Sequence, residues 1–436
     1  MSFTKTIVVC LLILYSGLYS QALPDSIKND SFHFQHTIVS QWHPSFRSIY
    51  SGTNSVGSDQ ENAISVTSTL FLGARLFSNT ELYFNPELSG GTGIGGTHGI
   101  AGFPNGEIYR VDDASPKISL ARLFIRQTFN LGSDKIFYED SQNQIASLKG
   151  RERIVLTLGR FSVSDIFDNN SYSHDPRNQF LNWSVMSSAA WDYPADTRGY
   201  TWGFAVEYFC REFALRGAAV MVAEDVNGMV LDSKIEKAFG IVLEFERKFV
   251  LDNRNGVIRF LVFSNKARMG NYAEAMNNKD GNVDISRTRL YGRNKTGFAL
   301  NAEISPENNL GLFLKLSWND GKNESWMFTE IDRSITLGGT IRNLKLINDS
   351  DEIGAAVVVN GISEDHKNFL QKGGYGFIVG DGALNYGPEF ILEVYWKFEL
   401  LPNCYVSPDY QFILNPAYNI DRGPINMFGV RLHYEK

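Results

Sequence analysis

After its first twenty-odd residues, the 436-residue sequence lacks any apolar run long enough to form a membrane-spanning helix. Such a helix needs about 20 consecutive apolar residues, so helical spans are excluded from the rest of the chain. The mean hydropathy of −0.19 agrees with this exclusion. Because unpaired backbone groups are not tolerated in lipid, the chain is either a soluble protein or a closed β-barrel.

The sequence also lacks a net positive charge and has few cysteines and histidines. The formal net charge is −7 and becomes −8 once Lys5 leaves with the leader described below, which argues against a nucleic-acid partner. Of the three cysteines, Cys10 lies in that leader, and Cys210 and Cys404 remain. The seven histidines show no spacing typical of metal ligands, so no metal site is expected.

Motifs for cofactor binding and catalysis are missing as well. The run from Gly91 to Gly96 satisfies G-x-G-x-x-G, but the following segment, 97–104, contains further glycines and a proline and predicts no helix. A dinucleotide fingerprint must open a helix after a strand. No serine–histidine pair can be placed for lipid hydrolysis. We therefore expect no cofactor and no enzymatic activity.

The N-terminus has the features of a secretory signal peptide. Lys5 supplies a positive charge, residues 7–18 are largely apolar, and Ser20-Gln21-Ala22 is a small-x-small cleavage site. We expect residues 1–22 to be removed and residues 23–436 to form a single domain. A short anchor helix is the alternative, but the apolar segment is too short for one.

What the sequence does contain is strict alternation. From Glu389 to Leu400 the even positions are all apolar, whereas Glu389, Glu393, Lys397 and Glu399 occupy odd positions. Side chains alternate across a strand, so one face is apolar and the other charged. The pattern recurs in segments of about ten residues, which is typical of a transmembrane β-barrel with an apolar lipid face and a polar lumen.

The alternation predicts sixteen antiparallel strands and no long helix. They are expected at 32–43, 63–76, 80–88, 118–129, 154–161, 200–208, 213–222, 239–249, 257–264, 296–304, 310–318, 330–341, 353–361, 388–400, 407–415 and 425–434. Links after even-numbered strands are mostly short and links after odd-numbered strands are longer, as in an outer-membrane barrel. The segment 130–153 breaks this rule and is interpreted only as an insertion. Cys210 and Cys404 fall eight strands apart on one rim, too far for a disulfide.

Charged strand residues are expected to face the lumen, because Arg or Lys facing lipid at the midplane costs about 2–4 kcal/mol. Both signs of charge occur, so the wall forms no simple anion or cation ring. Such a wall suits neutral solutes with many hydroxyls, since carboxylates accept hydrogen bonds and guanidinium groups donate them. Each of these residues could instead be an ordinary solvated lumen residue. The expected set is Glu81, Glu87, Arg122, Arg126, Glu207, Glu244, Glu246, Arg259, Glu303, Lys315, Glu393, Lys397 and Arg431.

The third long loop, 162–199, is the densest in aromatic and hydrogen-bonding side chains. Aromatic rings can stack on the C–H face of a pyranose while Asn, Asp and Arg bind its hydroxyls. The aromatic residues could instead pack the loop against the barrel wall. The candidate constriction residues in this loop are Asp168, Arg177, Asn182, Trp183, Trp191, Asp192 and Arg198, and those on the wall are Arg122, Arg126, Glu244 and Glu393.

The same loop carries a family resemblance. The stretch from Tyr172 to Trp183, then Trp191-Asp192-Tyr193-Pro194 and the run from Arg198 to Gly203, resembles the carbohydrate-selective porins (OprB-type) of Gram-negative outer membranes. Further matching segments, among them 101–107, 318–322 and 415–419, extend the resemblance over nearly the whole mature chain. It implies a sixteen-stranded barrel that admits glucose and other sugars, with the third loop folded inward to narrow the channel.

We therefore predict an integral outer-membrane porin for passive, selective diffusion of carbohydrates. Its expected partners are mono- or oligosaccharides in transit and outer-membrane lipid, and the assembly is a monomer or a homotrimer. One alternative is a general porin that selects by size alone. Another is a secreted β-rich binding protein.

Overall fold

The computed structural model describes residues 27–108, 114–277 and 283–436. Sixteen of its strands form one closed antiparallel barrel, in which β18 pairs with β1. The predicted sixteen-stranded barrel is thus confirmed, and each expected range overlaps one barrel strand. These strands are β1 (Asp30–His43), β2 (Glu61–Phe77), β3 (Thr80–Gly91), β4 (Lys117–Asn130), β7 (Arg153–Phe161), β8 (Thr201–Phe209), β9 (Phe213–Val220), β10 (Phe239–Leu251), β11 (Arg254–Ala267), β12 (Arg293–Glu307), β13 (Leu310–Asn319), β14 (Arg333–Arg342), β15 (Glu352–Gly361), β16 (Glu389–Leu401), β17 (Cys404–Leu414) and β18 (Ile425–Glu435).

The remaining elements are short. The strands β5 (Lys135–Tyr138) and β6 (Ser147–Gly150) form a separate hairpin. The helices are α2 (Trp183–Met186), α3 (Tyr272–Met276) and α4 (Glu364–Gln371), and the 3-10 turns are η1 (Ile94–Thr97), η2 (Val163–Asp165), η3 (Ile285–Thr288) and η4 (Pro416–Tyr418). Within the described ranges, no helix is long and apolar enough to cross a membrane. The predicted signal peptide lies outside the described residues.

The barrel wall has two chemically different faces. In β18, Phe428, Val430 and Leu432 are 44%, 45% and 42% exposed on the outside, whereas Arg431 and His433, which alternate with them, are each 1% exposed. Their burial arises because loops fill the barrel interior. Nine of the charged residues predicted to face the lumen are buried in this way: Glu81, Glu87, Glu244, Glu246, Arg259, Glu303, Lys315, Glu393 and Arg431.

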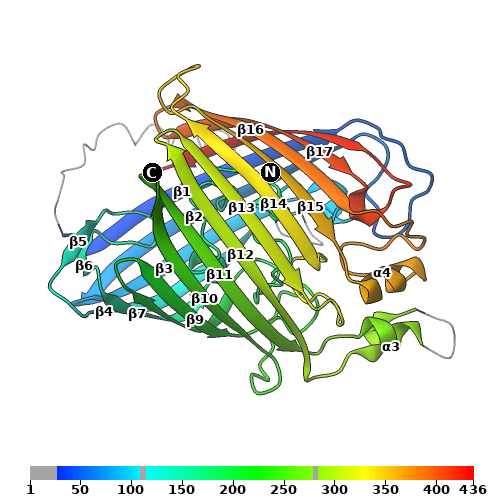
Figure 1. The fold of residues 1–436 in the computed structure, drawn as a ribbon, viewed down its shortest axis with the longest axis horizontal. Helices are drawn as coiled ribbons and strands as arrows, with labels where there is room; N and C mark the ends of the chain where they lie inside the picture. The colour runs from blue at the N-terminus through cyan, green and yellow to red at the C-terminus, as the bar shows by residue number, and fades with distance from the viewer. Residues whose placement is uncertain (1–26, 109–113, 278–282) are drawn as a thin grey trace.

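The two rims differ as predicted. Tight turns join β2 to β3, β8 to β9, β10 to β11, β12 to β13 and β16 to β17 at one end, which we call the short-turn rim, and long loops lie at the other. Figure 1 shows α3 and α4 at the loop end and the β5–β6 hairpin at the opposite end. The hairpin occupies the 130–153 link, the expected exception. Cys210 and Cys404 both lie at the short-turn rim and are unpaired.

The barrel closes between the first and last strands of the chain. The register runs from Gln35 opposite Glu435 to Trp42 opposite Phe428. Beyond that ladder, Phe34 and Lys436 exchange two backbone hydrogen bonds of 2.8 and 2.9 Å. Every barrel strand is therefore paired on both sides, and the wall has no free edge.

Candidate functional site

The third loop, residues 162–200, crosses the barrel interior and is held there by charged wall residues. The Glu393 carboxylate in β16 accepts a hydrogen bond from the Asn182 backbone N–H at 3.1 Å. On another part of the wall, Lys315 in β13 donates to the Ser173 carbonyl at 2.7 Å. These contacts to inward-facing side chains of β13 and β16 show that the loop is folded inward, as predicted.

Asp168 anchors the start of this loop. Its backbone N–H donates to Glu244 in β10 at 2.7 Å, and Glu244 also accepts from Arg216 at 2.8 Å. The Asp168 carboxylate itself accepts from the Ser188 backbone N–H at 2.6 Å and from Asn301 Nδ2 at 2.7 Å. The carboxylates of Asp168 and Glu244 thus form hydrogen bonds that hold the loop against the wall.

Asp192 joins the third loop to the loop after β13, and Trp191 packs within the third loop. The Asp192 carboxylate accepts from the backbone N–H groups of Trp326 and Met327 at 2.9 and 2.7 Å. Trp191 is 2% exposed and packs edge-to-face on Phe167, with ring centroids 6.5 Å apart. Both side chains therefore support the loop from within.

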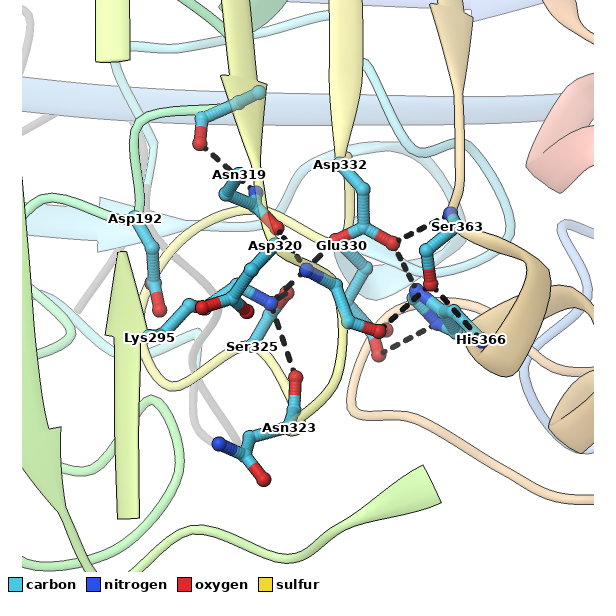
Figure 2. Close-up of polar contacts among 12 residues, drawn as sticks. Asp192, Lys295, Asn319, Asp320, Asn323, Ser325, Glu330, Asp332, Ser363 and His366 are labelled. Carbon is cyan, nitrogen blue, oxygen red and sulfur yellow. Dashed lines mark hydrogen bonds and ion pairs between the residues drawn. The ribbon is translucent and has the colours of Figure 1, made fainter. Parts of the chain in front are cut away.

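The loop after β13 is itself fixed by a buried polar cluster, shown in Figure 2. Asp332 lies 3.4 Å from the Lys295 ammonium and accepts from the Ser363 backbone N–H at 2.9 Å and from His366 Nδ1 at 3.0 Å. Burial would raise the pKa of Asp332, but the Lys295 and His366 charges hold it well below its ordinary range. One ionised carboxylate thereby connects β12, the loop after β13 and α4.

A cavity of about 520 Å³ lies between the third loop, the β3–β4 loop and the wall formed by β1 to β4. It also extends toward the short-turn rim, because residues 141–144 of the β5–β6 hairpin line it. Five predicted residues line this cavity, namely Arg122, Arg126, Arg177, Trp183 and Arg198. Six others lie outside its lining and hold the loop or the wall, namely Asp168, Asn182, Trp191, Asp192, Glu244 and Glu393.

One side of the cavity carries paired charges. The Arg177 guanidinium donates to Glu107 at 2.7 Å and to Glu87 at 3.1 Å. Arg122 in β4 binds both carboxylate oxygens of Asp165, at 2.7 and 2.6 Å. Bidentate and multiple pairing fixes these side chains in one geometry. The charges of opposite sign lie close together, so the surface offers both donors and acceptors.

Another part of the cavity lining is an aromatic stack. Trp183 stacks with Phe103 and with Phe328, at centroid distances of 5.0 and 5.3 Å and interplanar angles of 21° and 25°. Tyr193 stacks on Phe328 at 4.5 Å and 16°. All four rings line the cavity. Because each ring supports the next, the stack forms a rigid apolar wall.

Several lining residues were not among the predicted contacts. Glu107 and Phe103 come from the β3–β4 loop and Phe328 from the loop after β13, while Tyr193 lies in the third loop itself. Phe103, Glu107 and Tyr193 lie in segments that carry the family resemblance, and this resemblance was the sequence signal that could have identified them. Phe328 had no local signal, because only the fold brings it beside Trp183.

Comparisons with known proteins agree with this architecture. The family described as "Carbohydrate-selective porin, OprB family" matches residues 53–435. The structure of Pseudomonas putida OprB at high pH is similar, with a TM-score of 0.70, 15% identity and 94% of each chain covered. Its low-pH structure has a TM-score of 0.51 at 12% identity, covering 94% of this chain and 93% of that one. The outer-membrane channel DcaP of Acinetobacter baumannii also has a TM-score of 0.51, at 8% identity, with 93% and 97% covered. No curated protein sequence matches significantly.

Proposed function

The chain belongs to the carbohydrate-selective porins of the OprB family, and from this premise we propose that it passes glucose and related sugars by passive, selective diffusion. As a member it is an integral outer-membrane channel and not an enzyme. The observation that supports the choice of substrate is the cavity, whose lining combines an aromatic stack with paired arginines and carboxylates.

This arrangement matches the chemistry of a hexose. A pyranose has an apolar C–H face and a rim of hydroxyls that both donate and accept hydrogen bonds. The aromatic stack around Trp183 suits the apolar C–H face of the sugar. The pairs of Arg177 with Glu87 and Glu107 suit its hydroxyls, because they offer both donors and acceptors. A simple ion gains less from such a wall, because Arg122 and Arg177 already have carboxylate neighbours.

We assign contact with the sugar to Trp183, Arg177, Arg122, Arg126 and Arg198, the predicted residues that line the cavity. The six predicted residues outside the lining are proposed to act by keeping the third loop in place. Binding has to be weak for a channel to release its solute. Millimolar affinity corresponds to about −4 kcal/mol, which a few hydrogen bonds and apolar contacts supply.

The test is sugar block of single-channel current in planar bilayers, combined with liposome swelling across sugars of increasing size. We expect glucose to reduce the ion current reversibly, and monosaccharides to enter faster than their size alone predicts. Ion current that no sugar reduces, with swelling rates ordered only by solute size, would instead identify a general size-selective porin.

A further inference from the structure

The hairpin inserted between β4 and β7 reaches into the barrel from the short-turn rim. Ser141 and Gln144 pair across a tight turn at Gln142 and Asn143, with backbone hydrogen bonds of 2.9 and 3.0 Å. Asn143 has a positive φ of 54°, which asparagine tolerates better than most residues. We call residues 141–144 the hairpin tip.

The tip is fixed to the inner wall. Arg126 in β4 donates from Nη1 to the Asn143 carbonyl at 2.8 Å. The Ile145 backbone N–H donates to the Tyr83 hydroxyl at 3.2 Å, and Ile145 is completely buried. Arg126 lies four residues before Asn130, where β4 ends. At about 3.3 Å per residue, the tip therefore contacts the wall about 13 Å above that end of the strand.

The residues that flank the tip are tethered on other sides. Asp140 pairs with Lys28 at 2.9 Å and with His33 in β1 at 3.4 Å. Arg75 in β2 donates to the Ala146 carbonyl at 3.3 Å. Contacts to β1, β2, β3 and β4 give the hairpin a defined position inside the rim.

The tip faces the same cavity as the third loop, and all four of its residues line it. These side chains are one serine, two glutamines and one asparagine, all uncharged and able to donate and accept hydrogen bonds. The Asn143 Oδ1 atom is buried and has no hydrogen-bond partner among the described residues. An acceptor without a partner is costly, and Asn143 as a whole is only half-buried and lines the cavity. A rotation of its amide toward the cavity would therefore let it accept a hydrogen bond from a solute hydroxyl.

We propose that the hairpin tip is a second sugar-contacting site, which determines specificity at the short-turn end of the pathway. Its ligand is a neutral polyhydroxylated solute of hexose size. The site rests on the proposed function, since it is the same solute that would pass from the Arg177 region to the tip. The family resemblance suggested the third loop only, whereas the geometry assigns a role to the opposite mouth.

Thiol modification tests the position of the tip. In a background with Cys210→Ser and Cys404→Ser, we compare Gln142→Cys with Leu148→Cys, a control in β6 that is 44% exposed and absent from the cavity lining. A charged methanethiosulfonate reagent should lower the ion conductance and weaken glucose block in Gln142→Cys only. Unchanged conductance and block after complete modification of Gln142→Cys would overturn the proposal.

A second variant tests the hydrogen bond. Asn143→Gly keeps the positive φ and removes the amide, so we expect the glucose affinity measured by current block to fall about fivefold, as for one lost hydrogen bond. Equal block in Asn143→Gly and the wild type would reject the tip site while the proposed function stands. Absence of block by any sugar in the wild type would reject the proposed function, and the tip site with it.

Discussion

Arg177 in the third loop and Glu107 in the β3–β4 loop form an ion pair inside the barrel, with Nε 2.7 Å from Oε1. Glu107 also accepts a hydrogen bond from Thr67 in β2. Two loops and the wall thus meet at one carboxylate. Because both side chains are largely buried, either charge would be costly to leave unpaired.

Replacing Arg177 by Ala should therefore widen the cavity and weaken the loop contact. We expect higher ion conductance, weaker glucose block and a loss of about 1–3 kcal/mol in the free energy of unfolding. Urea unfolding in vesicles and single-channel recording measure these effects. The control is Arg247→Ala, which breaks an exposed pair with Glu212 and should cost less than about 1 kcal/mol. Equal losses in the two variants would contradict the role given to Arg177.

The two loop tryptophans should behave differently. Trp183→Ala removes part of the cavity wall, so glucose block should weaken while ion conductance stays equal or rises. Trp191→Ala empties a buried site outside the lining and should lower the free energy of unfolding by about 3–5 kcal/mol. Trp183→Phe is the control, because it keeps an aromatic ring in the stack. Unaltered block in Trp183→Ala, in folded protein, would remove Trp183 from the contact set.

Variants at two adjacent residues of β16 should affect different steps, one the assembly of the barrel and the other the support of the third loop. Val394 faces outward, so Val394→Arg should impair folding through a penalty of about 2–4 kcal/mol at the midplane. Glu393 faces inward and accepts the backbone N–H groups of Leu181 and Asn182 at 2.5 and 3.1 Å. Glu393→Gln should assemble but hold the loop less firmly. A gel-shift folding assay compares the yields, and similar yields would refute the assigned faces.

Acidification should loosen the polar cluster around Asp332. The Asp332 carboxyl has a lower pKa in the folded state than the value of about 3.9 that it has in the unfolded chain. It therefore stabilises the fold fully when the pH is above that unfolded value, and this stabilisation is lost as the pH falls toward and through the folded-state pKa. Proteolysis of the outer loops should therefore be slow at neutral pH and faster below about pH 4. Asp332→Asn should be cleaved faster at neutral pH and show a smaller further increase on acidification. Identical pH profiles would exclude Asp332 as the group responsible.

Strand positions were predictable because alternation has a direct physical cause. Glu393 and Val394 are adjacent in sequence and point to opposite faces, so one charged and one apolar residue specify the register. The sixteen strands and the inward third loop followed from this pattern together with the family resemblance. The insertion at 130–153 has only two strands of four residues each, which is too little alternation to reveal a hairpin.

The individual site residues were harder to predict, because a loop has no periodicity. Nothing in the sequence distinguishes Trp183 from Trp191, yet Trp183 lines the cavity and Trp191 supports the loop. Glu107 and Phe328 belong to other loops and join the site only through the closed barrel. Composition could therefore identify the correct loop but not the direction of each side chain.

The ladder between β1 and β18 also constrains how the protein can be inserted into its membrane. It joins the two strands that are farthest apart in the sequence, and contacts of such separation are slow to form. An incomplete sheet would expose the backbone of two edge strands to hydrocarbon, where each unsatisfied group costs several kcal/mol. A half-inserted intermediate is thus excluded as a free species. The edges of β1 and β18 therefore have to be kept away from hydrocarbon until the two strands meet, so closure of the barrel is a condition of its full insertion.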